Sequence, residues 1–205
     1  MNDRQIRMAL RRVVFRRCLS KPGAVLLEEL GIRHGAARVD LALINGSLHG
    51  FEVKSDRDSL TRLENQVRLF NSVFDRMTLV VGYRHAGVAI KMIPDWWGVK
   101  LADLGPRGAV RFSDARTPQN NPDVDKHFVV KLLWKGEALE ILTGFGLQTG
   151  LKAKSRKVIY QRLAENADLE FIRAKTREAL KVRRAEKSAV PSESDGDLSS
   201  LRASL

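Results

Sequence analysis

Cysteine, aromatic residues and long apolar runs are all scarce in this chain of 205 residues. Its one cysteine, Cys18, excludes an internal disulfide, and the four histidines have no zinc-ligand spacing with it. No apolar run approaches the length of a membrane span, and the arginine-rich start lacks the hydrophobic segment of a signal peptide. We therefore expect a cytoplasmic protein that does not enter a membrane; a mitochondrial presequence is the alternative for the amphipathic, arginine-rich start.

Two common catalytic or nucleotide-binding motifs are also missing. The glycine-rich stretch "GFGLQTG" lacks the Lys-Ser/Thr end of a phosphate-binding loop, and there is no Gly-x-Ser-x-Gly nucleophile motif. A bound nucleoside triphosphate and serine-hydrolase chemistry are therefore not expected.

Positive charge is abundant, and it is concentrated near the two ends of the chain. The formal net charge is +12; residues 1–21 hold seven basic and one acidic side chain, and residues 151–187 hold twelve and five. The stretch between them is almost neutral. Such segments indicate either contact with a nucleic-acid backbone or solvated helix faces, and composition alone does not separate the two interpretations.

Apolar periodicity predicts an α/β core followed by helices. The predicted core elements are a helix over 4–19 with Val13 on its buried face, a short helix over 24–30, a β-hairpin around Asn45-Gly46, a helix over 59–75 capped by Asp58, and strands over 77–83 and 88–93. The segments "PDWWGVKLAD" and "GAVRFSD" then form either a closing loop with edge strands or a hairpin. Helical patterns without strand signals follow at about 125–134, 136–144, 155–165 and 168–185.

A segment rich in proline and asparagine, "ARTPQNNPDVD", divides these two parts. We accordingly predict an α/β core over residues 1–114, a linker over 115–124, a basic all-α appendage over 125–187 and a disordered, serine-rich tail over 188–205.

The hairpin carries charged residues where a strand is usually apolar. Glu52 and Lys54 alternate with Val53 and therefore share one face of their strand. A three-residue loop, Asn45 to Ser47, or an equivalent bulge at Gly50, places Asp40 opposite Glu52; a two-residue turn places them on opposite faces.

Two directly opposed carboxylates repel each other unless a cation lies between them. Mg²⁺ prefers carboxylate oxygens, so we predict the three-residue loop and a metal site. The alternative is a cross-strand salt bridge on an exposed sheet face.

The segments "RVDLAL" and "GFEVKSD" resemble the core motif of the PD-(D/E)xK nuclease superfamily, and the similarity covers roughly residues 1–105. This resemblance implies a restriction-endonuclease-like core, a mixed central sheet flanked by helices with a metal site at the mouth of the hairpin. Val39 replaces the proline in the superfamily's name.

The resemblance also implies roles for particular residues. Asp40 and Glu52 would bind the metal together with the carbonyl of Val53, and Lys54 would be the catalytic lysine. Glu29, with Glu28 as the alternative, resembles an acidic residue of a preceding helix that assists the metal.

Two further positions match in part. Gln66 with Phe70 resembles a Gln-x-x-x-Tyr element that lines the site from the next helix, although Phe70 lacks the tyrosine hydroxyl.

These observations predict a Mg²⁺-dependent nuclease, with Mn²⁺ as a substitute, that hydrolyses phosphodiester bonds and acts on nucleic acid, with DNA favoured over RNA. One active site per chain leaves a homodimer open. The rivals are a nucleic-acid-binding module that keeps the fold without turnover, and a structural adaptor for an acidic protein. The predicted nucleic-acid contacts are Arg38, Arg57, Lys152, Lys154, Arg156 and Lys157.

Overall fold

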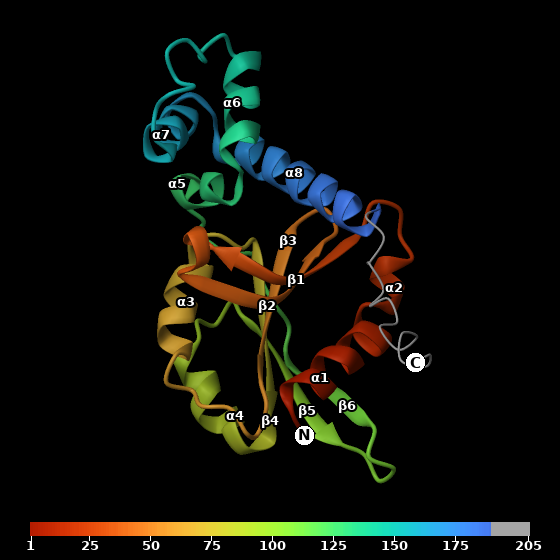
Figure 1. Cartoon of the computed structure of the whole chain (residues 1–205). Coiled ribbons are helices and arrows are strands. Elements are labelled where there is room, and N and C mark those ends of the chain that lie inside the picture. Colours follow the sequence, from red (N-terminus) through yellow and green to blue (C-terminus); the bar gives the residue numbers. More distant parts are fainter. Residues whose placement is uncertain (190–205) are drawn as a thin grey trace, which may run out of the picture.

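Six strands form one mixed sheet at the centre of the protein, in the order of the sequence (Figure 1). The computed structural model describes residues 1–189. Strands β1 to β3 are antiparallel, β4 and β5 run parallel to β3, and β6 is antiparallel to β5. The strands are β1 (Val25–Ile32), β2 (Ala37–Ile44), β3 (Leu48–Lys54), β4 (Arg76–Gly82), β5 (Gly98–Leu104) and β6 (Val110–Arg116).

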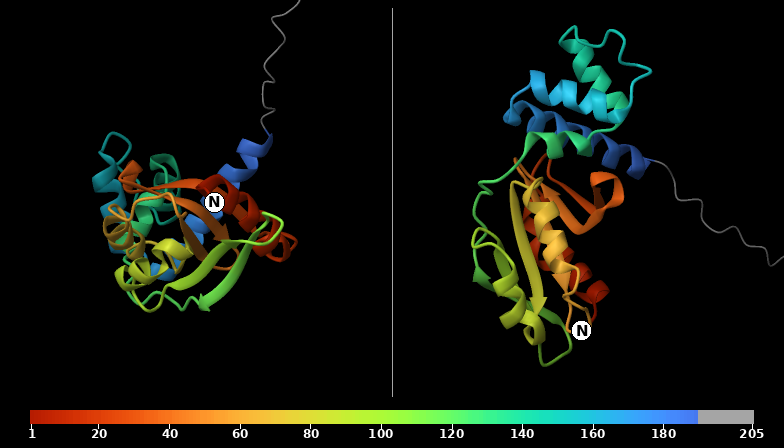
Figure 2. Two further views of the ribbon diagram at one scale, coloured as in Figure 1. Left: turned by 90° about the horizontal axis from the view of Figure 1, so that it is seen from below. Right: turned by 90° about the vertical axis from the view of Figure 1, so that its left-hand side faces the viewer.

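Helices cover both faces of the sheet (Figures 1 and 2). One face packs against α1 (Asp3–Ala9), the π-helical turn η1 (Leu10–Val14) and α2 (Arg16–Leu19). The other face packs against the elements that connect the parallel strands, namely α3 (Leu63–Asn71), α4 (Tyr83–Ala89) and η3 (Ile90–Met92). Because both faces are covered, the central strands are buried almost throughout.

A helical region follows the sheet and has its own apolar core. Figure 1 shows it at one end of the sheet, with the long α8 running back across that end. Its elements are α5 (Lys126–Val129), η4 (Val130–Leu132), α6 (Lys135–Gly144), α7 (Arg156–Asn166) and α8 (Leu169–Ala189). The predicted class, an α/β protein with a C-terminal helical region, is confirmed.

Asp75 connects the helical region to the sheet. Its carboxylate lies 2.8 Å from Arg173 and 3.6 Å from Arg177, both on α8, and it accepts the backbone N–H of Leu48 at 2.7 Å. Leu180 of α8 also belongs to the apolar core between the sheet and helices α3 and α4. The helices are thus attached to the first residue of β3, the strand that ends in Lys54.

Two predicted elements were wrong. Residues 25–30, six of the seven predicted as a short helix, belong to strand β1, which pairs with β2 from Val25↔Ile44 to Ile32↔Ala37. A short apolar run fits a strand or a helix equally well, and pairing with β2 decides the outcome. Residues 88–93 were expected to be a strand, but they end α4 and form η3.

Helix boundaries and faces also differ from the prediction. Helix α3 runs only from Leu63 to Asn71, with Arg62 at its N-cap. Asp58 does not cap it; its carboxylate accepts the N–H of Ser55 at 2.7 Å in the turn after β3. Val13, expected to be buried, is 63% exposed. Of the predicted tail, Ser188 and Ala189 belong to α8 and the rest lies outside the described residues. Within residues 1–189, no helix combines the length and apolarity that crossing a bilayer requires.

We predict that Asp75→Asn lowers the free energy of unfolding by about 1–3 kcal/mol, because it removes the largely buried anion of Arg173 and Arg177, which then keep only the exposed carboxylate of Glu170. Urea denaturation measures this change. Asp123→Asn, at an exposed position, is the matched control, and equal stability of the two variants would contradict the assigned role of Asp75.

Candidate active site

The β2–β3 hairpin has the predicted three-residue loop. Ile44 pairs with Leu48, Gly46 adopts φ +77°, and the N–H of Asn45 donates to the carbonyl of Ser47 at 3.2 Å. Leu41 pairs with Phe51, so the same register continued by one residue places Asp40 opposite Glu52. This prediction is confirmed. The alternative, an exposed salt-bridge patch, is wrong because Glu52 is 1% exposed and Lys54 6%.

Glu52, Lys54 and Gln66 form a closed triangle of hydrogen bonds. Lys54 Nζ donates to Glu52 Oε1 at 2.7 Å and to Gln66 Oε1 at 2.9 Å, and Gln66 Nε2 donates to Glu52 Oε1 at 2.6 Å. The two strand residues come from β3, and Gln66 reaches them from α3. Since a buried charge needs a partner, the triangle makes burial of the lysine and glutamate tolerable.

Asp40 completes the cluster from β2. Its Oδ2 accepts the backbone N–H of Val53 at 2.7 Å. In the structure, Val53 therefore takes part in the cluster through its backbone N–H. That its carbonyl binds the metal stays a prediction.

Burial leaves both carboxyl groups poorly solvated. It raises the pKa of Asp40 to about 6, and it raises the pKa of Glu52 to about 8, with the charge of Asp40 as the second cause. Glu52 Oε2 is buried and has no hydrogen-bond partner among the described residues. A cation beside these two carboxylates would relieve both penalties, and their oxygens are the donors that Mg²⁺ prefers. The residues present therefore fit a hard divalent ion.

These groups line a cleft of about 510 Å³, which we call the acidic cleft. Its lining includes Asp40, Glu52, Lys54 and Gln66, together with Arg38 and Arg62. Sequence reasoning missed Asp3, a first-turn residue of α1 that also lines the cleft and whose charge contributes to the raised pKa of Asp40. No spacing relates Asp3 to the hairpin; only the packing of α1 on the sheet brings it there.

Glu29 lies on strand β1, and its expected place on a helix was wrong. It has φ +55°, and its carboxylate pairs with Arg7 and Arg38, which hold the pKa of Glu29 below its usual range. It borders the acidic cleft, yet residues 1–189 contain no cluster of three or more His, Cys, Asp or Glu side chains placed to hold a metal. The structure does not bring Glu29 to Asp40 and Glu52. Glu28 is no substitute, because it pairs with Arg11.

The predicted nucleic-acid contacts fall into separate groups. Arg38 borders the acidic cleft, 3.1 Å from Glu29. Arg57 lies in the turn after β3, and it is exposed. The others lie in the helical region, before or at the start of α7: Lys152, Lys154, Arg156 and Lys157. The structure therefore does not gather them around the acidic cleft.

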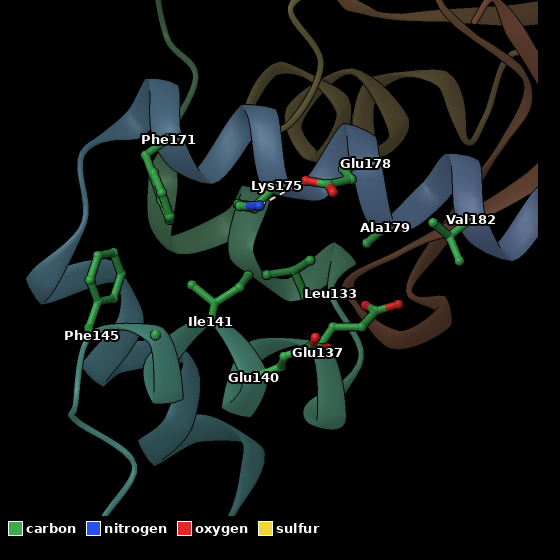
Figure 3. A pocket seen from close by; sticks show the side chains of 11 residues that line it. Leu133, Glu137, Glu140, Ile141, Phe145, Phe171, Lys175, Glu178, Ala179 and Val182 are labelled. Atoms are coloured by element: carbon green, nitrogen blue, oxygen red, sulfur yellow. Dashed lines mark hydrogen bonds and ion pairs between the residues drawn. The ribbon is translucent and has the colours of Figure 1, made fainter.

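A hollow of about 590 Å³ in the helical region has a different character (Figure 3). It lies between α6 and α8, and its walls include Leu133, Ile141 and Phe145. Its carboxylates are already engaged in part, since Glu178 pairs with Lys175 and Glu137 with Arg183. The hollow is mainly apolar with an acidic rim, which suits neither a phosphate nor the chemistry of the acidic cleft.

Comparison with known proteins corrects the family expected from the sequence. The family model described as "Bacteriophage P4 protein cII" matches residues 3–194, so assignment to the PD-(D/E)xK superfamily was wrong. "Protein cII" of Enterobacteria phage P4 is 26% identical over 174 residues, which cover 84% of this chain and 65% of that protein. The chain thus matches just under two thirds of that relative's length. No solved structure shows significant similarity.

The raised pKa of Glu52 predicts a pH dependence of stability in metal-free protein. Folding raises this pKa from an ordinary 4.5 to about 8, so the folded state holds one proton more than the unfolded state between these values. Stability from this group is present below pH 4.5 and is lost as the pH rises towards 8. We expect the wild type to lose as much as about 1.4 kcal/mol per pH unit relative to Glu52→Gln.

Urea unfolding of both proteins in EDTA between pH 5 and 8 measures the difference. Asp40 is common to both proteins, so its own titration largely cancels. Parallel stability curves would show that Glu52 is not protonated on folding.

Proposed function

The chain belongs to the bacteriophage P4 protein cII family, and we propose from the geometry of the acidic cleft that it is a metal-dependent nuclease that hydrolyses phosphodiester bonds, in DNA in particular. The observation that carries the proposal is the pairing of the half-buried Asp40 with the buried Glu52 beside the Lys54 ammonium, with Glu52 Oε2 lacking a partner among the described residues. Burying an acid and a lysine beside a second acid is costly, and carboxyl groups whose pKa values are strongly raised in a cleft are candidates for a functional site.

Asp40, Glu52 and the Val53 carbonyl would hold the metal. When bound, Mg²⁺, or Mn²⁺ in its place, would neutralise the two carboxylates and polarise a phosphate oxygen.

The residues of the chain supply the rest of the chemistry. Lys54 lines the cleft and its Nζ donates to Glu52 Oε1, so the amino group can meet the charge that develops on phosphorus or orient the attacking water. Gln66 bonds to both Lys54 and Glu52 and so fixes their orientation. Arg38 and Arg62 border the cleft, where they can hold flanking phosphates.

The finer fold assignment, a restriction-endonuclease-like core, is part of the proposal. It is supported by an antiparallel hairpin that carries the acidic residues, followed by a helix and a strand parallel to β3. A cytoplasmic location belongs to the proposal as well.

A second candidate function is a nucleic-acid-binding module without turnover. One observation favours it: Glu52 Oε1 already accepts from both Lys54 and Gln66, and no third carboxylate converges with Asp40 and Glu52 among residues 1–189. Such a module would bind DNA in EDTA and would not cleave it with Mg²⁺.

We predict that Lys54→Ala lowers cleavage by about 10²-fold or more while DNA binding in EDTA is nearly unchanged, because the lysine acts on the reacting phosphate. A panel of duplex, single-stranded and branched DNA and RNA, with Mg²⁺, Mn²⁺ or EDTA, measures both properties. Lys100→Ala is the matched control, since Lys100 is also a strand lysine paired with an acidic residue, Asp114, but lies outside the acidic cleft. Cleavage at the wild-type rate by the Lys54→Ala, Asp40→Asn double variant would contradict the assignment of these residues to the active site.

We also predict that Mn²⁺ raises the melting temperature of the wild type and not that of Asp40→Asn, because an ion that binds only the folded site stabilises it. Thermal unfolding with and without metal tests binding independently of activity. An equal shift in both proteins would place the metal elsewhere.

A further inference from the structure

A second cleft of about 550 Å³ lies where the sheet meets the helical region. It is lined by side chains of the turn η2 (Arg33–Gly35) between β1 and β2, of α5 and η4, and of the first turns of α7. Its polar lining consists of Arg33, His127, Lys131, Lys157 and Gln161, together with Tyr160. We call it the basic cleft, because three of these side chains are basic and none is acidic.

The basic side chains are held together although they repel one another. The Arg33 guanidinium lies 4.7 Å and Lys131 Nζ 4.3 Å from the centre of the Phe128 ring, so one aromatic residue holds both cations. Burial lowers the pKa of Lys131, and the charge of Arg33 lowers it further, with only partial compensation from Asp125. Cations arranged in this way favour an anion between them.

No carboxylate forms an ion pair with these side chains in the part of the chain that is described, and Asp125 offsets the repulsion at Lys131 only in part. Within residues 1–189, the side chains of Arg33, Lys131 and Lys157 make no ion pair and no hydrogen bond to another residue. Two arginines of α8, by contrast, are paired, Arg173 with Asp75 and Arg183 with Glu137. Arg33 and Lys157 are exposed and Lys131 is half-buried, so three unpaired cations face the basic cleft where an anion from solvent can reach all of them.

The backbone at Arg33 is itself unusual. It has φ +51°, a conformation that residues with a Cβ atom rarely adopt, and it shares this property with Glu29 alone among the non-glycine residues described. The turn uses this conformation to leave β1 with Arg33 directed at the helical region while Gly35, two residues on, borders the acidic cleft. One short turn thus separates the two clefts.

We propose that the basic cleft binds the phosphodiester backbone of DNA a few nucleotides away from the segment held in the acidic cleft. The Cα atoms of Arg33 and Gly35, which line one cleft each, are at most about 7 Å apart, and a DNA strand rises about 3.4 Å per nucleotide, so the near edges of the two clefts lie within reach of one strand. A guanidinium, two ammonium groups and an amide suit phosphate oxygens. Only the placement of DNA across both clefts rests on the proposed nuclease function; the anion site itself does not.

The experiment is a binding titration in EDTA, in which no metal-dependent cleavage takes place. Fluorescence anisotropy of a labelled duplex of about 20 base pairs is followed across a salt series for the wild type and for Arg33→Gln, Lys131→Gln and Lys157→Gln. Each variant should bind about 3- to 10-fold more weakly, and its slope of log K against log salt concentration should be smaller by about 0.9.

The matched control is Arg107→Gln, which removes one exposed positive charge from the turn between β5 and β6. That turn lies at the end of the sheet away from α5 and α7 (Figure 1). The control should retain the wild-type slope. If the three cleft variants match Arg107→Gln in both affinity and slope, the proposal fails.

Two competitors identify the anion. Unlabelled DNA should displace the probe, and polyglutamate of equal charge should not; equal displacement by polyglutamate would overturn DNA as the ligand in favour of an acidic polypeptide. The experiment separates the DNA site in the basic cleft from the proposed nuclease function. Salt-dependent binding through Arg33, Lys131 and Lys157 without cleavage would refute only the nuclease function. Cleavage that persists while all three variants bind normally refutes only the basic cleft.

Discussion

The central constraint in this protein is the burial of Glu52 beside Asp40 in the middle of a sheet. Desolvation opposes the charge on both side chains, and the Lys54 and Gln66 hydrogen bonds offset only part of that cost, at one oxygen of Glu52. The surrounding architecture is arranged to maintain this pair. The hairpin loop sets the register, α3 supplies Gln66, and the helices on both faces exclude water from the strand that carries Glu52.

The features that could be predicted from sequence are those governed by local rules. The Asn-Gly pair and the alternation of apolar residues determined the register of the hairpin, and with it the approach of Asp40 to Glu52. Apolar periodicity likewise placed the helices of the C-terminal region within a few residues. The motif that led to the acidic cleft was therefore informative about geometry even though the family assignment drawn from it was wrong.

The features that could not be predicted depend on contacts between distant segments. Strand β1 was mistaken for a helix because its apolar pattern is too short to decide, and pairing with β2 supplied the missing information. Asp3 enters the acidic cleft only through the packing of α1. Arg33 and Lys131 are almost a hundred positions apart in sequence, and the Phe128 ring that holds both has no signal that relates it to either.

The single carboxylate of Asp75 has a consequence for how the chain can be divided. It binds two arginines of α8 and also the first backbone N–H of β3, so the helical region and the strand that ends in Lys54 share one attachment point. A fragment that stops before α5 would lose both arginines and expose the apolar surface that Leu180 covers. The sheet and the helices are thus best regarded as one folding unit, and neither is a module that recombination could exchange on its own.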